Sequence, residues 1–433
     1  MIGGREALRR SVRERLGEGV FAHGVLLLGP RGVGAEETAL WIAKASVCEG
    51  EGEIPCGGCG PCLSFASAGD LDLSIIRPVD HPVWAHRDDL ERHFPEGIGP
   101  ALEELQAEGF LLSPLPAAAG RRLVPLRFDP AALFRKGRGT ARFDRSAFAR
   151  RLDGSGVGEG AKAFLRETFL APHSVEWYLS SIGIGFMTGS DEPAATAGRA
   201  AVIPFLGRRP AARRRKVVIV EEAERMTEEA QNALLKTLEE PPPDSLLLLT
   251  CSRREGLLDT IRSRCEQVKI GSPGPAERAE AAGRFFVDIA PDEWEALLLL
   301  GEGAPGQAAE FDLELLREER EQAESLLRSA EGGSLAAFFP DLESWVDGLE
   351  EGGENEFQKA ARLLSLFLVV ARERAVEASA EGGGADLARA RRLFRAAHGA
   401  LASIRPGANL RLLLEEFGVN LWRSAAPAEG DPA

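Results

Sequence analysis

The pattern of hydrophobic and polar residues changes character once along the chain, near residue 271. Before that point, short apolar runs bounded by glycine, proline or charged residues predict the strands of a buried parallel sheet. Amphipathic stretches between these runs predict helices. The expected strands are residues 25–28, 73–76, 216–220, 246–250 and 268–270, and the expected helices are 37–47, 227–240 and 257–264.

After this point the strand signals disappear and helical periodicity takes over. Residues 276–311 predict a small helical module, and the chain from 314 onward predicts a helical bundle. Glycine-rich breaks at 351–353 and 382–384 separate the expected helices, and the last residues, 424–433, predict a disordered tail. The fold class is therefore an α/β domain followed by all-α domains.

Residues 77–181 interrupt this pattern, because apolar helical pieces alternate there with turn clusters such as 153–156. We expect an insertion of partly helical character. Its middle is rich in arginine, and such a run most often marks a solvated surface. A contact with nucleic acid is the alternative for this segment, and equally for the basic run at 208–216.

The residues between the first expected strand and helix have the glycine frame of a phosphate-binding loop without its chemistry. In the working pattern, G-x-x-x-x-G-K-[ST], the lysine reaches the phosphates and the hydroxyl binds Mg²⁺. Gly29, Gly32 and Gly34 supply the frame, but Ala35 and Glu36 stand at the lysine and hydroxyl positions. Alanine carries no charge and glutamate repels phosphate. We therefore expect no hydrolysis at this loop, and we do not expect ATP to bind there.

The strand at 216–220 ends in two acidic residues, Glu221 and Glu222, at the position of a Walker B motif. The usual first acid is an aspartate that holds Mg²⁺. Because the loop already lacks the groups that bind a magnesium nucleotide, we interpret the two glutamates as residues that close the sheet and not as catalytic groups.

Four of the six cysteines lie together in the spacing C-x₇-C-x₂-C-x₂-C. They are Cys48, Cys56, Cys59 and Cys62. Tetrahedral Zn²⁺ binds four thiolates, and tight C-x₂-C steps deliver them from turns that glycine and proline form here. We predict a structural zinc site, and the alternative is a chance cluster of reduced thiols.

Composition narrows the class of protein. The chain has 433 residues, 44% of them hydrophobic and 27% charged, which is ordinary for two or three globular domains. The net charge of −15 disfavours a protein whose whole surface wraps nucleic acid, and it suits a subunit that contacts other proteins. We find no apolar run of the ~20 residues that a membrane span needs and no export signal, so we expect a cytoplasmic protein.

Arg264 stands in the sequence Ser-Arg-Cys after a short expected helix. An arginine at a subunit boundary can stabilise the charge on a phosphate that is being transferred in a neighbour's site. From chemistry alone, a surface arginine in a salt bridge is the more ordinary interpretation.

In combination, these segments resemble the delta-prime subunits of bacterial DNA polymerase III clamp loaders, a family of AAA+ proteins. The resemblance covers roughly residues 1–79 and 181–423. The segments that carry it are the strand and loop at 26–34, the four-cysteine module, 216–226 with 230–242, 260–265, 301–308 and 409–415.

The resemblance implies a RecA-like AAA+ domain over 1–271, a helical lid at 272–330 and a helical collar at 331–423. The first domain carries the zinc module at 48–62 and the insertion at about 77–181, which is far longer than the family leads one to expect. The resemblance also implies that Arg264 is an arginine finger that reaches the ATP site of an adjacent subunit.

The implied partners are the gamma/tau ATPase subunits, the delta subunit and, through the complex, the sliding clamp and primer–template DNA. The hypothesis is thus a non-hydrolysing clamp-loader subunit that holds the ring together and supplies an arginine to its neighbour. Two alternatives stay open: an active ATPase of the gamma/tau type, and a zinc-containing regulator that binds nucleic acid through the basic insertion.

Overall fold

The structure is a computed structural model, and it divides the chain into two compact units. The first unit is Met1–Ile289 with Ala304–Glu310, and the second is Ala290–Gly303 with Phe311–Ala433. The residues that the structure describes are 6–65, 72–78, 83–112, 121–129, 145–170, 175–178, 202–211, 214–332, 334–350, 356–405 and 408–425.

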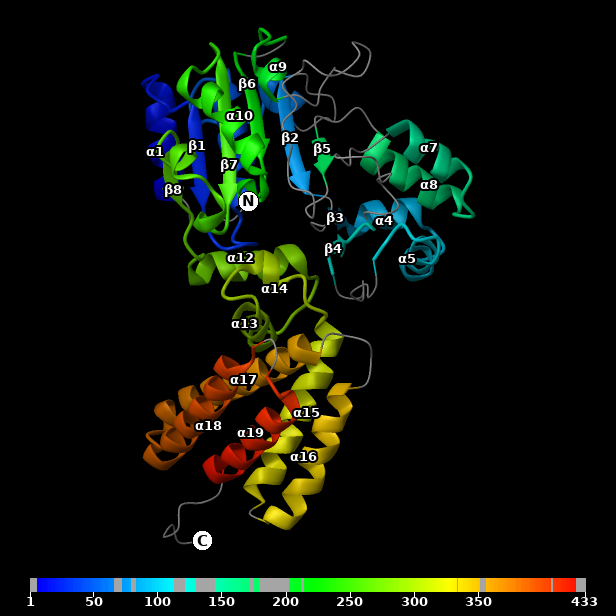
Figure 1. Cartoon of the computed structure of the whole chain (residues 1–433), viewed down its shortest axis with the longest axis vertical. Coiled ribbons are helices and arrows are strands. Elements are labelled where there is room, and N and C mark those ends of the chain that lie inside the picture. The colour runs from blue at the N-terminus through cyan, green and yellow to red at the C-terminus, as the bar shows by residue number, and fades with distance from the viewer. Residues whose placement is uncertain are drawn as a thin grey trace. The chain divides into compact units, whose positions relative to one another are not determined.

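A six-stranded sheet forms the centre of the first unit, with the strand order β5-β2-β6-β7-β1-β8 and every pair of neighbours parallel (Figure 1). Its strands are β1 (Gly24–Leu28), β2 (Leu73–Pro78), β5 (Val175–Tyr178), β6 (Lys216–Val220), β7 (Ser245–Cys251) and β8 (Glu266–Lys269). A parallel sheet is covered on both faces, which explains why the central strands are almost wholly apolar.

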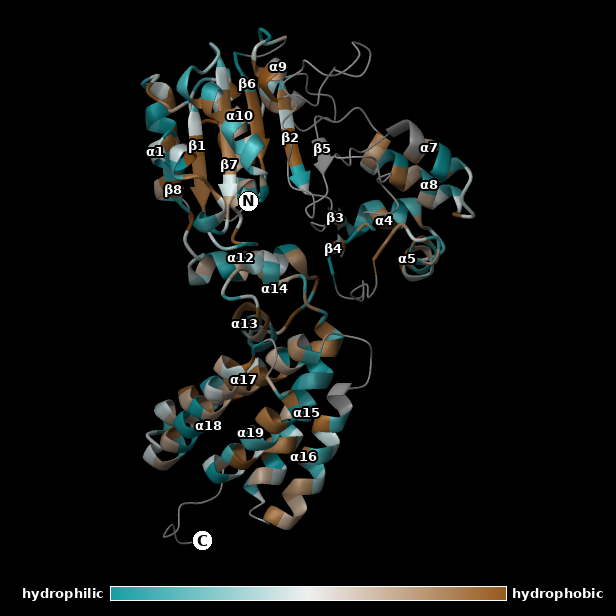
Figure 2. Cartoon of the chain, in the orientation of Figure 1, coloured by the Kyte–Doolittle hydropathy of each residue, from teal (hydrophilic) through white to brown (hydrophobic). Residues whose placement is uncertain are grey.

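Helices cover both faces of the sheet, and alternate strand residues pack against each layer. Leu27 and Ile219 belong to the core with α2 (Ala35–Val47) and α1 (Glu6–Gly17). Leu26 belongs to the core on the other face, with α9 (Val202–Leu206), α10 (Glu228–Glu239) and α11 (Asp259–Arg262). Figure 2 shows these strands as a hydrophobic centre. The α/β fold class predicted from the sequence is confirmed at this level.

The five expected strands are present within one or two residues of the expected bounds, and the sixth, β5, has no counterpart in the sequence prediction. The expected cap of α10 is also present, because the Thr227 side chain accepts a hydrogen bond from the Ala230 amide. Strand β5 was missed because it is a short edge strand whose apolar and polar residues are mixed.

The chain between β2 and β5 has a hydrophobic core of its own. It contains an antiparallel pair, β3 and β4, and four α-helices in its described parts. Aromatic rings fill the core: the rings of Phe128 and Phe169 meet edge to face with their centroids 4.6 Å apart. The elements are β3 (Val83–His86), α4 (Arg87–His93), α5 (Ile98–Ala107), β4 (Leu123–Leu126), α7 (Arg145–Asp153), α8 (Glu159–Leu165) and the π-helix Arg166–Leu170.

Two helices of the first unit follow the sheet: α12 (Pro275–Phe285) and the short α14 (Pro305–Ala308). Helix α13 (Pro291–Leu300), which lies between them in sequence, belongs to the second unit. The chain segment expected to form the lid, 272–330, is therefore shared between the two units, and its role as a lid stays a prediction.

The second unit is wholly helical in its described residues. Aromatic residues from three helices meet in its core, where the rings of Phe367 and Phe417 lie 5.0 Å apart and Trp345 contacts both. A buried Glu319 is held by two hydrogen bonds from Arg362, at 2.6 and 2.7 Å. The helices are α13, α15 (Leu313–Glu331), α16 (Leu335–Glu350), α17 (Glu356–Glu381), α18 (Gly384–Ser403) and α19 (Leu410–Ala425).

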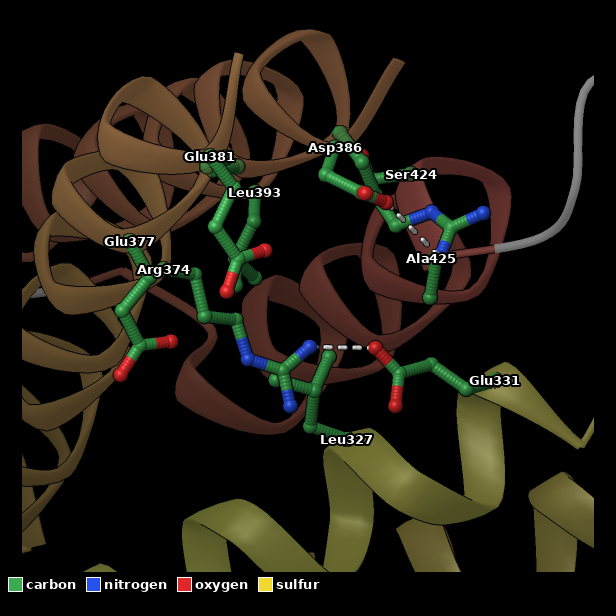
Figure 3. Close-up of a pocket in the computed structure, with 12 residues that line it drawn as sticks. Leu327, Glu331, Arg374, Glu377, Glu381, Asp386, Leu393, Ser424 and Ala425 are labelled. Atoms are coloured by element: carbon green, nitrogen blue, oxygen red, sulfur yellow. Dashed lines mark hydrogen bonds and ion pairs between the residues drawn. The ribbon is translucent and has the colours of Figure 1, made fainter. Parts of the chain in front are cut away.

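A cavity of about 240 Å³ opens between α15, α17, α18 and α19 (Figure 3). Carboxylates and two arginines line it over an apolar floor, and one of those arginines, Arg374, is paired with Glu331. The last described residue, Ala425, lines the cavity. The sequence predicts a disordered tail over 424–433, but Ser424 and Ala425 are buried at the end of α19, and 426–433 lie outside the described residues. None of the helices in the described part of the chain has the length and apolarity needed to cross a membrane.

Candidate functional site

The carboxyl ends of the central strands bring the glycine loop and the two glutamates singled out in the sequence to one edge of the sheet. In open α/β sheets, ligands bind at this edge, outside the carboxyl ends of the strands. Here β1 leads into the loop Gly29–Gly34, and β6 leads into Glu221 and Glu222. Strand β7 lies between β1 and β6 and carries Thr250 one residue before its end, so the two motifs lie on either side of one strand.

Arg77, near the end of β2, forms an ion pair with Glu221. The register of β2 and β6 pairs Ile76 with Val220, which places the next residues of the two strands side by side. The Arg77 guanidinium donates two hydrogen bonds to the Glu221 carboxylate, at 2.7 and 2.8 Å. Burial lowers the pKa of Arg77, but the charge and hydrogen bonds of Glu221 raise it by more, so the pKa of Arg77 lies above its ordinary value. The carboxylate that would hold Mg²⁺ is thus neutralised by a fixed cation of the protein.

Glu222 is engaged in a similar way by arginines. Its carboxylate pairs with Arg31 of the loop, at 3.3 Å, and with Arg225. Its backbone adopts the left-handed conformation (φ 51°), and its amide donates to the Thr250 hydroxyl at 3.1 Å. These contacts fix the turn after β6 and give it a structural role.

The start of α2 carries its own negative charge where a phosphate would lie. A helix N-terminus attracts anions because its backbone amides and dipole point outward. Glu36 and Glu37 lie in the first turn of α2. Arg284, from α12, pairs with Glu37, and Glu36 accepts a hydrogen bond from Thr250 at 3.4 Å. These acidic side chains compete with an anionic ligand for the helix N-terminus.

Backbone from α14 lies directly on the loop. The Gly306 amide donates a hydrogen bond of 2.8 Å to the carbonyl of Gly32. Gly32 has φ +72°, and a Cβ atom there would lie 2.5 Å from the Gln307 amide nitrogen. Only glycine allows this close approach of two backbones.

Arg264 lies away from this edge. Its carbonyl passes close to Gly24, the first residue of β1, whereas the loop follows the last residue of that strand. The two ends of β1 are about 13 Å apart at the usual rise of a strand. The Arg264 side chain is about one-third exposed, pairs with Glu239 at 2.5 Å and donates to the Thr260 carbonyl at 3.0 Å. This arginine is therefore not placed to serve the chain's own loop.

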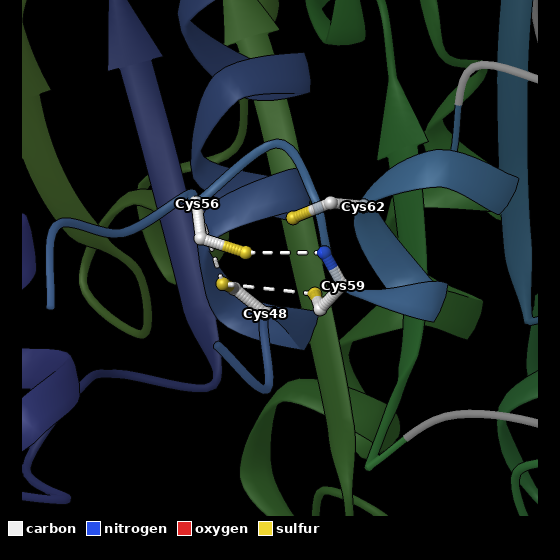
Figure 4. A group of neighbouring side chains, drawn as sticks. All are labelled: Cys48, Cys56, Cys59 and Cys62. Carbon is white, nitrogen blue, oxygen red and sulfur yellow. Dashed lines mark hydrogen bonds between the residues drawn. The ribbon is translucent and has the colours of Figure 1, made fainter. Parts of the chain in front are cut away.

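The four clustered cysteines converge on one point after α2 (Figure 4). Their sulfur atoms all lie within 4.8 Å of one another, and those of Cys48 and Cys59 are 4.0 Å apart. A tetrahedron of four sulfurs at 2.3 Å from a zinc ion has edges of about 3.8 Å. The donor set and its spacing fit a zinc ion, which these four cysteines could hold.

Backbone amides point at several of these sulfurs. The Cys56 amide donates to the Cys48 sulfur at 3.3 Å, and the Glu49 amide to the Cys59 sulfur at 3.5 Å. The Glu49 amide lowers the pKa of the Cys59 thiol to about 6, whereas burial raises the pKa of the Cys62 thiol to about 12. Amide donors of this kind stabilise thiolates, which are the form that binds a metal.

The basic insertion is electrically mixed in its described part. Several of its arginines form ion pairs within the insertion: Arg87 with Glu91, Arg92 with Asp89, and Arg166 with Asp153. The densest basic stretch, 135–142, lies outside the described residues. The described residues add no observation that favours a nucleic-acid interface over a solvated surface.

The loop, the two glutamates, Arg264 and the cysteines are recognisable in the sequence, whereas the residues that contact the loop and Glu221 are not. Arg77 and Gly306 had no local signal, because each acts on a residue more than a hundred positions away. The sequence signal nearest to them is the pair Ala35 and Glu36, which stand where the phosphate-binding pattern has lysine and a hydroxyl residue.

The fold and this edge thus define a parallel-sheet α/β protein with an altered phosphate-binding loop and a cysteine cluster, followed by a helical region. Residues 4–93 and 200–273, less than half of the chain, match the family model described as DNA polymerase III, delta subunit. No curated protein matches the chain.

Two solved structures from Thermotoga maritima are similar to this chain, with low TM-scores. One is a DNA polymerase III gamma subunit-related protein, 16% identical, which covers 97% of this chain and 99% of its own, with a TM-score of 0.34. The other is a variant of RuvB with a single substitution, 12% identical, which covers 90% of this chain and 85% of its own, with a TM-score of 0.30. At these scores neither likeness carries an argument about function.

Proposed function

We propose that this chain is a non-hydrolysing subunit of a bacterial replicative clamp loader, of the delta-prime type. The match of residues 4–93 and 200–273 to a DNA polymerase III subunit family supports the assignment to this complex. The observation that carries the non-hydrolysing role is the pairing of Arg77 with Glu221 beside a loop that has lost its lysine and hydroxyl.

In this role the helical region holds the chain in the ring, and Arg264 acts on a neighbour. Arg264 lies at the opposite end of β1 from the chain's own loop, is partly exposed and is held by Glu239. An arginine so placed can stabilise phosphoryl-transfer charge only in a site formed with another subunit. The gamma/tau ATPase is the neighbour that the proposal assigns, with the delta subunit, the sliding clamp and primer–template DNA as further partners in the cytoplasm.

The cysteine cluster has a structural part in this proposal. Four thiol ligands leave no open position on a tetrahedral zinc ion, so the metal would supply stability and no catalysis. Cys48, Cys56, Cys59 and Cys62 would hold it and would fix the turn between α2 and the next strand.

The test is to purify the tagged full-length chain from its native cells and identify what copurifies by mass spectrometry. We expect the gamma/tau and delta subunits to copurify. We also expect the chain alone to show no ATP turnover above that of a variant with Gly34 replaced by Val. Turnover by the lone chain that the Gly34→Val change abolishes would contradict the non-hydrolysing role. Absence of both subunits from the copurified proteins would contradict the assignment to the clamp loader.

A further inference from the structure

The insertion between β2 and β5 binds the stretch of chain that covers the altered loop. We call this stretch, Ala304–Glu310, the cover segment; it belongs to the first unit although the residues on both sides belong to the second. Something in the first unit must hold it there. It is held by residues on either side of strand β4 of the insertion.

Arg121, just before β4, makes the first contact. It is buried, with 1% of its surface exposed, and its Nη1 donates a hydrogen bond of 2.5 Å to the carbonyl of Ala309. Its guanidinium lies over the ring of Phe286, 5.0 Å from the centroid. Burying a guanidinium is costly unless hydrogen bonds and a cation–π contact compensate it. Arg121 therefore binds the cover segment and the end of α12 at once.

The backbone next to Arg121 makes the second contact. The Arg122 amide donates to the carbonyl of Phe285 at 2.9 Å, and Arg121 and Phe286 form an antiparallel bridge. From β3, the ring of Trp84 packs on the ring of Phe285 at 5.1 Å. At the far end of β4, Arg127 pairs with Glu310, the last residue of the cover segment.

The cover segment in turn lies directly against the loop at Gly32. A Cβ atom at Gly306 would lie 2.8 Å from the Gly32 carbonyl oxygen and 2.9 Å from the Gly32 Cα atom. The hydrogen bond from Gly306 to Gly32 thus joins two backbones in direct contact. A ligand that approaches the loop at Gly32 must therefore displace this segment first.

We propose that the insertion acts as an internal strap. By holding Ala309, Glu310 and the end of α12, it keeps the cover segment on the altered loop, so the loop stays closed without any nucleotide. This gives the insertion a role that the clamp-loader assignment does not supply. The inference does not depend on that assignment, because every contact lies within the first unit.

The test is hydrogen–deuterium exchange on the full-length chain with Arg121→Met, which keeps an apolar side chain over Phe286 but removes the donor and the charge. We expect exchange in peptides covering 28–36 and 303–310 to become about tenfold faster or more. Peptides of β6, in the centre of the sheet, should stay as protected as in the unchanged chain. Arg166→Met is the matched control, because Arg166 pairs with the exposed Asp153 within the insertion, and it should change neither peptide.

A milder variant covers the case in which Arg121→Met does not fold. Trp84→Leu weakens the packing on Phe285 and should accelerate exchange of 303–310 to a smaller extent. Gly306→Ala should open the loop from the other side and leave the β3–β4 pair protected. Unchanged exchange at 303–310 in folded Arg121→Met or Trp84→Leu would overturn the proposal. Acceleration spread evenly over β1 and β6 would do the same, because it would show general destabilisation.

Discussion

Arg77 and Glu221 stand on adjacent parallel strands and are joined by two hydrogen bonds of 2.7 and 2.8 Å. Only 2% of the Glu221 side chain is exposed, so its charge would be costly without a partner. The arginine supplies a permanent positive charge where nucleotide-hydrolysing relatives of this fold place a magnesium ion. This pair therefore joins the carboxyl ends of β2 and β6 and should stabilise the fold.

Replacing Arg77 with Met should lower the free energy of unfolding by about 3 kcal/mol, because it removes two hydrogen bonds and a positive charge from the buried carboxylate of Glu221. This is the lower end of the range for buried pairs, since 26% of the Arg77 side chain is exposed. The double change Arg77→Met with Glu221→Leu should recover most of the loss. Urea denaturation measures both. Arg87→Met, which breaks the exposed pair with Glu91, should cost less than about 0.5 kcal/mol. An equal loss in the single and double variants would show that the pair is not the cause.

Replacing Arg264 with Ala should lower the ATPase rate of the reconstituted complex at the neighbouring site by at least about tenfold, because an arginine finger stabilises transition-state charge. Assembly, followed by gel filtration, should not change. Arg264→Lys should restore little, since lysine lacks the planar fork of donors.

Arg262 offers the control, because it ends the short helix α11, two residues before Arg264, and pairs locally with Asp259. Arg262→Ala should leave the ATPase rate within about twofold of normal. If Arg264→Ala and Arg262→Ala behave alike, the assignment of Arg264 as the finger is wrong.

Replacing Cys59 with Ser should remove one metal ligand and lower the bound zinc toward zero, measured by inductively coupled plasma mass spectrometry. The free energy of unfolding should fall by more than about 2 kcal/mol, because metal binding stabilises only the folded site. Cys265→Ala is the control: Cys265 is buried elsewhere in the core, so this change should keep the zinc whatever it does to stability. Zinc retained in full by Cys59→Ser would contradict the metal site.

Gly50 gives an independent test of the same site without altering a ligand. A Cβ atom at Gly50 would lie 2.4 Å from the sulfur of Cys56, so Gly50→Ala must push that ligand aside. We expect weaker zinc retention during dialysis against a chelator. Gly60→Ala, where a Cβ atom meets nothing within 4 Å, should retain zinc normally.

Glu293 should make the stability of the helical unit depend on pH. Hydrogen bonds from Arg317, at 2.6 and 3.2 Å, lower the pKa of Glu293, and burial opposes them less strongly. Because its pKa is lower in the folded state, Glu293 contributes stability above its ordinary pKa, and this is lost as the pH falls through the lowered value.

Glu293→Gln should therefore cost about 1 kcal/mol at pH 7 and progressively less below about pH 4. Urea denaturation at pH 7, 5 and 3.5 measures the difference. A cost that stays constant across this range would show that the charge of Glu293 has no part in it.

Much of the fold could be predicted from local pattern. The apolar runs of β1, β6 and β7 are long, uninterrupted and bounded, and the capped helix after Thr227 has a clear start and end. The cysteine spacing and the residues at Ala35 and Glu36 are also properties of adjacent positions. Such features are visible in sequence because residues a few positions apart determine them.

The partners of the site residues could not be predicted in this way. Glu221 was recognised in its motif, but its arginine comes from β2, 144 positions earlier. Strand β5 joins the sheet only because it reaches the edge of β2 after a long insertion. The pairing of distant segments depends on the register of strands and on the path of the insertion, which no local pattern encodes.

The sequence by itself determined that this protein has a parallel-sheet α/β domain, a glycine loop without the lysine and hydroxyl of the phosphate-binding pattern, four cysteines in metal-ligand spacing, and a helical region after the sheet. Only the tertiary structure decided which residues lie against this loop and against Glu221. Arg77 contacts Glu221 because the parallel sheet aligns the carboxyl ends of β2 and β6. The Gly306 amide contacts the loop at Gly32, and Arg121 of the insertion binds Ala309, three residues after Gly306. The physical reason is that a buried charge and a closed loop need partners in space, whatever their separation along the chain.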